Sequence, residues 1–221
     1  MMNYLQKKKQ ALLNYVSSGG RLPSEYQEVE WIENDTRGAY IDTQLSVANA
    51  TRIQANAKFE WVQVASGGNA ESCFLGCRTN NDRCMIFNMY PYLKWEIGYR
   101  TNYKSGSTFT TNTLYEVSAD FQSGSQTVVA NGDTVVSETI SGVVTQTNTL
   151  WVLGNNHSQS TNKFYCRAKI YSLDITIDGV KERDFVPCYR KADDEIGLYD
   201  LVYGTFYTNS GTGTFTKGQD V

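Results

Sequence analysis

Hydrophobic and polar residues alternate along most of the chain, which is the pattern of strands with one buried face. The clearest example is the segment 51–62, and residues 115–121 repeat the alternation. The apolar positions of the segment 51–62 are Ile53, Ala55, Ala57, Phe59 and Trp61. Further strands are expected at 29–32, 39–43, 73–77, 84–89, 93–99 and 149–153.

Two dipeptides predict tight hairpin turns between strands. Asn131-Gly132 and Asp178-Gly179 each stand between β-rich runs, and such pairs adopt the positive φ angles that these turns need. About a dozen short strands without an alternating helix pattern predict an all-β fold, a two-sheet antiparallel sandwich or jelly roll.

One short N-terminal α-helix is expected over residues 3–16, with Leu5, Leu12 and Val16 on one stripe. Ser17 to Gly20 would end it and form a flexible linker. We therefore divide the chain into 1–20, an attachment or oligomerisation element, and 21–221, the sandwich. A helix of about four turns is too short to be stable alone, so it needs a partner surface. That surface is another protein, a second copy of the chain or the sandwich of the same chain.

Charge and composition narrow the function. The chain has 221 residues, with 20 Lys and Arg against 23 Asp and Glu, so no nucleic-acid partner is expected. The chain contains no apolar run of about 18 residues, so no membrane span is expected. The start of the chain does not match a signal peptide. Five cysteines are an odd number, and with a single histidine they predict buried, reduced thiols and no metal site.

Motifs at both ends of the chain resemble a known family. The first is the run 22–33, LPSEYQEVEWIE, followed by GAYIDT at 38–43. The second comprises RDFVPCYR at 183–190, GLYD at 197–200 and 206–215. Both resemble concanavalin A-like (laminin-G-like) jelly-roll modules, of the subgroup found in bacteriophage structural proteins and gut bacterial surface proteins.

The C-terminal motif also has a physical interpretation as framework. We expect Arg183 and Asp184 to pair locally, and Pro187 to end its strand. Gly197 and other glycines would mark tight turns between aromatic anchors.

The sequence does not predict an enzyme. Glycoside hydrolases need two facing carboxyl groups. The nearest match, Glu28-Val29-Glu30, lacks the central Asp of the sandwich glucanases, Glu96 has no second carboxylate in alternation, and the 193–195 cluster is more typical of a solvated turn. No nucleophile elbow, P-loop or metalloprotease motif occurs. Calcium is common in the fold that the chain resembles, but no EF-hand spacing appears, so we predict no cofactor.

Sugar-binding surfaces combine aromatic rings with amide, carboxylate and guanidinium groups. The densest such region is 80–103, and the loop 154–160 is a second candidate. In the region 80–103 the alternation is imperfect, and it leaves open whether the aromatic rings face the surface or the core. The candidate ligand-binding residues are Asn81, Asp82, Arg83, Tyr90, Tyr92, Trp95, Tyr99, Arg100, Asn156 and His157.

The resemblance implies a non-catalytic protein on the bacteriophage virion surface, in the tail or decorating the capsid. Its sandwich would attach to bacterial surface glycans, and its N-terminal helix would contact other virion proteins. Three alternatives stay open. They are a carbohydrate-binding module of the bacterial cell surface, a purely structural virion subunit and a divergent glycoside hydrolase.

Overall fold

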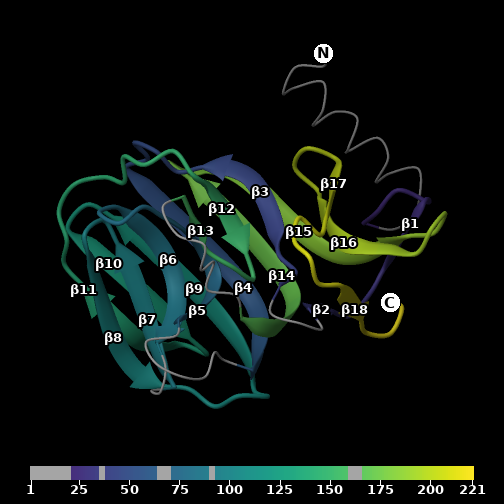
Figure 1. The fold of residues 1–221 in the computed structure, drawn as a ribbon, viewed down its shortest axis with the longest axis horizontal. Helices are drawn as coiled ribbons and strands as arrows, with labels where there is room; N and C mark the ends of the chain where they lie inside the picture. The colour runs from purple at the N-terminus through teal and green to yellow at the C-terminus, as the bar shows by residue number, and fades with distance from the viewer. Residues whose placement is uncertain (1–20, 35–37, 64–70, 90–92, 159–165) are drawn as a thin grey trace.

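The computed structural model describes residues 21–34, 38–63, 71–89, 93–158 and 166–221, and arranges them as a two-sheet β-sandwich (Figure 1). The larger sheet has the order β11-β10-β9-β4-β14-β15-β16-β17, with β1, β2 and β18 added at its margin. Its strands are β1 (Tyr26–Glu28), β2 (Ile32–Asn34), β4 (Arg52–Gln63), β9 (Leu114–Gln122), β10 (Ser125–Ala130), β11 (Asp133–Glu138), β14 (Arg167–Ile177), β15 (Val180–Arg190), β16 (Glu195–Asp200), β17 (Thr205–Thr208) and β18 (Phe215–Lys217).

The smaller sheet has the order β3-β12-β5-β6-β7-β8, and β13 joins it in parallel beside β5. Its strands are β3 (Ile41–Ser46), β5 (Glu71–Arg78), β6 (Arg83–Met89), β7 (Lys94–Tyr99), β8 (Asn102–Thr108), β12 (Thr149–Val152) and β13 (Asn156–His157). The all-β prediction is confirmed. The helix expected at 3–16 lies outside the described residues. Within the described ranges, no helix has the length and apolar character to cross a bilayer.

The core lies between the two sheets and is rich in aromatic rings. The alternation predicted in β4 is confirmed, because Ile53, Ala55, Ala57, Phe59 and Trp61 are all buried. Phe59 stacks on Phe74 of the facing sheet, with ring centroids 3.8 Å apart. All five cysteines are buried thiols, as predicted.

Both predicted hairpin turns are present. Asn131 and Gly132 have φ angles of 51° and 89°, and they join β10 to β11. Asp178 and Gly179, at 49° and 80°, join β14 to β15. The side chain of Asp178 also accepts hydrogen bonds from Thr51 and from the N–H of Arg52, so the turn holds the start of β4.

Pro187 and Gly197 do not have the roles that the sequence predicted for them in the C-terminal motif. Pro187 does not end a strand, because β15 continues to Arg190. Within a strand, the N–H and C=O of one residue point to the same neighbour. The Pro187 carbonyl accepts from Val29, so its missing donor faces the end of β1 and leaves the β16 ladder intact. Gly197 lies inside β16, where an added Cβ would stand 2.2 Å from the Tyr207 carbonyl oxygen.

Arg183 does not pair with its neighbour Asp184, contrary to the sequence expectation. Its buried guanidinium donates to the Thr43 carbonyl oxygen at 2.9 and 3.2 Å and lies 3.9 Å from Asp200. Asp184 instead pairs with Lys181 at 3.3 Å. Arg183 therefore connects β15 of the larger sheet to β3 of the smaller one.

A second apolar cluster lies where β1, β15, β16 and β17 extend beyond the main core (Figure 1). It consists of buried Leu22, Val186, Cys188 and Tyr199, with Tyr26, Leu201 and Phe206 packed against them. Beside this cluster, Val29 forms an isolated bridge with Asp220. The bridge brings the segment after β1 against the end of the described chain.

The Asp178 contacts predict a pH-dependent contribution to stability. Hydrogen bonds, first from the Thr51 side chain and then from the Arg52 N–H, lower the pKa of Asp178 below its ordinary 3.8. Its contribution is therefore present above pH 3.8 and is lost as the pH falls through the lowered value. We expect Asp178→Asn, which keeps a residue tolerant of positive φ, to lower the melting temperature at pH 7. The difference should shrink below pH 3.8, and a constant difference would contradict this account.

Candidate functional site

The two candidate rings that the structure describes belong to the core. Trp95 and Tyr99 are each 1% exposed, because alternate residues of β7 face the other sheet. Trp95 packs edge-to-face against Phe59 and Tyr115, and Tyr99 stacks on Phe121. Neither ring can stack on a surface ligand, so this part of the site prediction is corrected. Tyr90 and Tyr92 lie outside the described residues.

The polar candidates do gather at one end of the smaller sheet. Asn81 and Asp82 lie in the turn between β5 and β6, and Arg83 is the first residue of β6. The backbone N–H of Arg100 donates to the Arg83 carbonyl oxygen at 2.8 Å. The remaining candidates, Asn156 and His157, come to this end on β13, which pairs with β5.

Several of these polar groups hold the surrounding loops. One oxygen of Asp82 accepts from the N–H and hydroxyl of Thr145, at 2.6 and 2.7 Å, and from the N–H of Gln146. The His157 ring nitrogen lies 3.1 Å from the side-chain oxygen of Asn80. Asn156 donates to Thr149. These contacts give Asp82, Asn156 and His157 framework roles, and Asn81 stays exposed.

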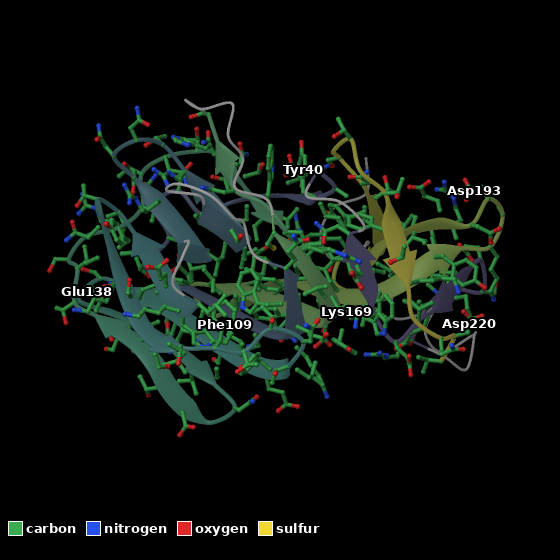
Figure 2. All side chains as sticks on the ribbon, turned by 60° about the horizontal axis from the view of Figure 1, so that its bottom comes forward. Tyr40, Phe109, Glu138, Lys169, Asp193 and Asp220 are labelled. Atoms are coloured by element: carbon green, nitrogen blue, oxygen red, sulfur yellow. The ribbon has the colours of Figure 1, made fainter. Side chains whose placement is uncertain are left out.

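A groove with an accessible indole lies elsewhere, beside the second apolar cluster. It encloses about 510 Å³, which is within the range of sites for small ligands. Figure 2 shows Asp220, one of its lining residues, at the opposite end of the molecule from Glu138. The groove is lined by Glu30, Trp31, Lys217, Gly218, Gln219 and Asp220.

Backbone pairing fixes the groove. Glu30 N–H donates to the Gln219 carbonyl and Gly218 N–H donates to the Trp31 carbonyl, both at 2.9 Å. Gly218 lies so close to the indole that an added Cβ would stand 2.8 Å from Trp31 Nε1. The half-buried ring is thus held by the adjacent backbone, and Lys169 lies over it with Nζ 5.1 Å from the ring centroid.

The polar groups of the groove are charged and oriented. Lys217 Nζ lies 2.8 Å from one oxygen of Asp220, and the Tyr189 hydroxyl donates to the other at 3.2 Å. The hydrogen bond from Lys217 lowers the pKa of Asp220, so this group is an ionised acceptor at neutral pH. The Glu30 carboxylate accepts from the Gln219 N–H.

An indole face beside fixed carboxylate, amide and ammonium groups suits a polyhydroxylated ring. The apolar C–H face of a sugar packs on an aromatic ring, while its hydroxyl groups donate to carboxylates and accept from N–H groups. In the sequence analysis Trp31 appears only within the N-terminal motif that resembles the jelly-roll family. The sequence did contain a signal for this site. It is a tryptophan next to an acidic residue, between two strand segments that are too short to bury its ring.

A second hollow, of about 380 Å³, lies on the outer face of the larger sheet. Asn56, Lys58, Ser118 and Asp174 are among its lining residues. No aromatic residue stands among those that line it in the described chain. It lacks the stacking surface that the Trp31 groove has.

The described part of the chain shows how its potential metal ligands and thiols are placed. No group of three or more His, Cys, Asp or Glu there is placed to hold a metal ion. Burial raises the pKa of the Cys77 thiol to about 12, so this thiol is protonated at neutral pH. Glu96 is buried and accepts from the Ser105 hydroxyl.

Comparison with known proteins supports the fold. The sequence matches no protein-family model and no curated protein. The structure resembles a proposed carbohydrate-binding protein from Bacteroides ovatus, with a TM-score of 0.60 and 9% identity over 88% of this chain. The chain spans 62% of the length of that protein. At this identity the likeness establishes a shared jelly-roll-like sandwich.

Two further solved structures resemble the chain at a TM-score of 0.49 each. One is a carbohydrate-binding module of the Ruminococcus gnavus IT-sialidase bound to α2,3-sialyllactose, at 11% identity over 69% of this chain and 89% of the module. The other is a heptameric pentraxin from Limulus polyphemus, at 10% identity over 67% of this chain and 76% of that one.

The burial of Trp95 makes its substitution a test of stability. We expect Trp95→Ala to lower the free energy of unfolding by about 3–5 kcal/mol, because it leaves a large cavity among Phe59, Phe109 and Tyr115. Tyr103→Ala is the control, since that ring is 53% exposed and its loss should change stability little. Urea unfolding of both variants makes the comparison. Equal losses would contradict the core assignment.

Proposed function

We propose that this protein is a non-catalytic carbohydrate-binding protein, and that the Trp31 groove holds the sugar. The observation that carries the proposal is the half-buried Trp31 indole in a groove of about 510 Å³ with Glu30, Gln219 and Asp220 around it. The indole matches the apolar C–H face of a pyranose, and the polar groups match its hydroxyl groups. The fold shared with a proposed carbohydrate-binding protein is consistent with this function.

We further propose that the protein acts on the surface of a bacteriophage virion, in the tail or on the capsid, and attaches to bacterial surface glycans. The support is the resemblance of the terminal motifs to phage jelly-roll proteins. Residues 1–20 would contact other virion proteins. A bacterial cell-surface module is the alternative location, and a structural subunit is the alternative role.

Hydrolysis is the competing activity, because Glu30 and Asp220 bring two carboxylates to one groove. A glycosidase needs one carboxyl group that stays protonated to act as the acid. The contact with Lys217 moves the pKa of Asp220 the other way. Asp220 is thus unsuited to be that acid, and we propose that Glu30 binds the sugar without donating a proton to it. Release of reducing sugar by the wild type that Glu30→Gln abolishes would instead establish a hydrolase.

Substitution of the groove residues tests the proposed site. We expect Trp31→Ala to weaken glycan binding at least about tenfold, or ~1.4 kcal/mol, because the stacking surface is removed. Gly218→Ala should also weaken it, since the new methyl group displaces the indole. Binding is measured on an array of bacterial capsular and lipopolysaccharide oligosaccharides.

Tyr103→Ala serves as the matched control, because it removes an exposed ring outside the groove. Thermal unfolding of each variant separates loss of the site from loss of the fold. If Trp31→Ala and Gly218→Ala fold and bind as the wild type does, the groove is not the site.

The proposed location is tested separately. We expect mass spectrometry of purified phage particles to detect the intact chain, and immunogold labelling to place it on the tail or capsid surface. Detection solely in host envelope fractions would instead favour the cell-surface alternative.

A further inference from the structure

The outer side of β14 connects the Trp31 groove to the second hollow. Lys169 stands at the groove end, with Nζ 5.1 Å from the centroid of the Trp31 ring. Asp174 stands at the other end and lines the hollow of about 380 Å³. Along a strand that rises about 3.3 Å per residue, Lys169 and Asp174 lie roughly 16 Å apart. This separation is longer than a single pyranose ring, so a saccharide that contacts both ends is an oligosaccharide.

A bulge in β14 adds an aromatic ring between the two ends. The register between β14 and β4 shifts between Ile170 and Ser172, which makes Tyr171 the extra residue. Ile170 and Leu173 are buried. The two residues between them, Tyr171 and Ser172, are half-buried and exposed. Because a bulge re-aims side chains, both of these residues lie on the outer side of the sheet.

Glu60 of β4 holds the groups at the groove end. One of its oxygens accepts from Lys169 Nζ at 3.3 Å, and the other accepts from the Tyr171 hydroxyl at 3.4 Å. Burial and then the charge of Glu60 raise the pKa of Tyr171 above its ordinary 10.0. The charge of Glu30 contributes to that rise, in keeping with a position near the groove. Glu60 thus orients both the ammonium over the indole and a second ring.

The hollow continues this stretch with polar groups. Asn56 Nδ2 donates to Asp174 Oδ1 at 3.1 Å, which orders the amide. Hydroxyl, amide and carboxylate groups at fixed spacing can exchange hydrogen bonds with the hydroxyl groups of a sugar. Polar side chains from three strands line the hollow in two rows, Ser118, Asn56 and Asp174 in one and Glu116, Lys58 and Ser172 in the other.

The charges along this stretch are mostly paired within the protein. Lys169 pairs with Glu60, and Lys58 Nζ lies 3.5 Å from Glu116. Asp174 adds a further carboxylate. Among these side chains carboxylates therefore outnumber ammonium groups, and like-charge contacts disfavour an acidic chain. A neutral, hydroxyl-rich chain meets no such cost.

We propose that the Trp31 groove, Tyr171 and the second hollow form one binding path along β14, and that its ligand is a neutral saccharide chain of several residues. Rings along the path would pack on the apolar faces of sugar rings, and the polar groups would bind their hydroxyl groups. Each sugar beyond the first then adds contacts, so affinity rises with chain length. This inference rests on the proposed carbohydrate binding, and it specifies the class of glycan.

A length series of neutral oligosaccharides tests the binding path. The probes are homo-oligomers of glucose, galactose and mannose with one, two, four and six residues, each titrated calorimetrically into the full chain. We expect the affinity for the best of these sugars to rise at least about tenfold from monomer to hexamer. Tyr171→Ala and Asn56→Ala should each lower that ratio at least about threefold, because they remove contacts beyond the first sugar. Gln54→Ala is the matched control, since Gln54 lies between buried Ile53 and Ala55 on the outer side of β4 but does not line the hollow.

A second measurement does not depend on the variants. Hydroxyl-radical footprinting of the wild type should show that the hexamer protects both Trp31 and Tyr171, whereas the monomer protects Trp31 alone. Thermal unfolding of each variant shows whether its fold is retained. Protection of Tyr171 by the hexamer supports the path even where Tyr171→Ala does not fold.

The outcomes separate this inference from the proposed function. Equal binding of monomer and hexamer would overturn the path and leave binding in the Trp31 groove in place. A length dependence that both Tyr171→Ala and Asn56→Ala leave intact overturns the path as well. Tighter binding of hexagalacturonate than of every neutral hexamer overturns the neutral class of ligand. Failure of every probe to bind overturns the proposed function together with this inference.

Discussion

Phe59 and Trp61 project from the same face of β4, and they contact rings from the smaller sheet. Phe59 stacks on Phe74, Trp61 stacks on Phe109, and Trp95 stands edge-on to Phe59. Large rings bury much apolar surface and fix the separation and register of the layers they join. This packing orients β5, β6 and β7 and leaves their alternate residues on the outer face.

The packing also explains why the aromatic-rich segment is not the ligand surface. A two-sheet core needs bulky side chains from both sheets, and β7 supplies Trp95, Ile97 and Tyr99 to it. An aromatic ring remains accessible where the main core ends. Trp31 lies between β1 and β2, and its backbone pairs with Gly218 near the described C-terminus.

The groove depends on close approach of the Gly218 backbone to the indole, which a side chain at that position would prevent. A sandwich fold accommodates such a site without changing its core, which is consistent with the many functions this architecture supports.

Patterns along the chain are enough to predict the class of fold and much of its local structure. Alternation along β4 and β9 and the turns at Asn131 and Asp178 follow from local chemistry, because strand periodicity and positive-φ turns are properties of short segments. Tertiary structure decided which face of β7 is buried, the strand continuing through Pro187, and the partner of Arg183. It also decided the groove, since Trp31 and Gly218 are far apart in the chain and meet through pairing of the two ends. Such long-range contacts depend on which strands become neighbours, and no local pattern encodes that choice.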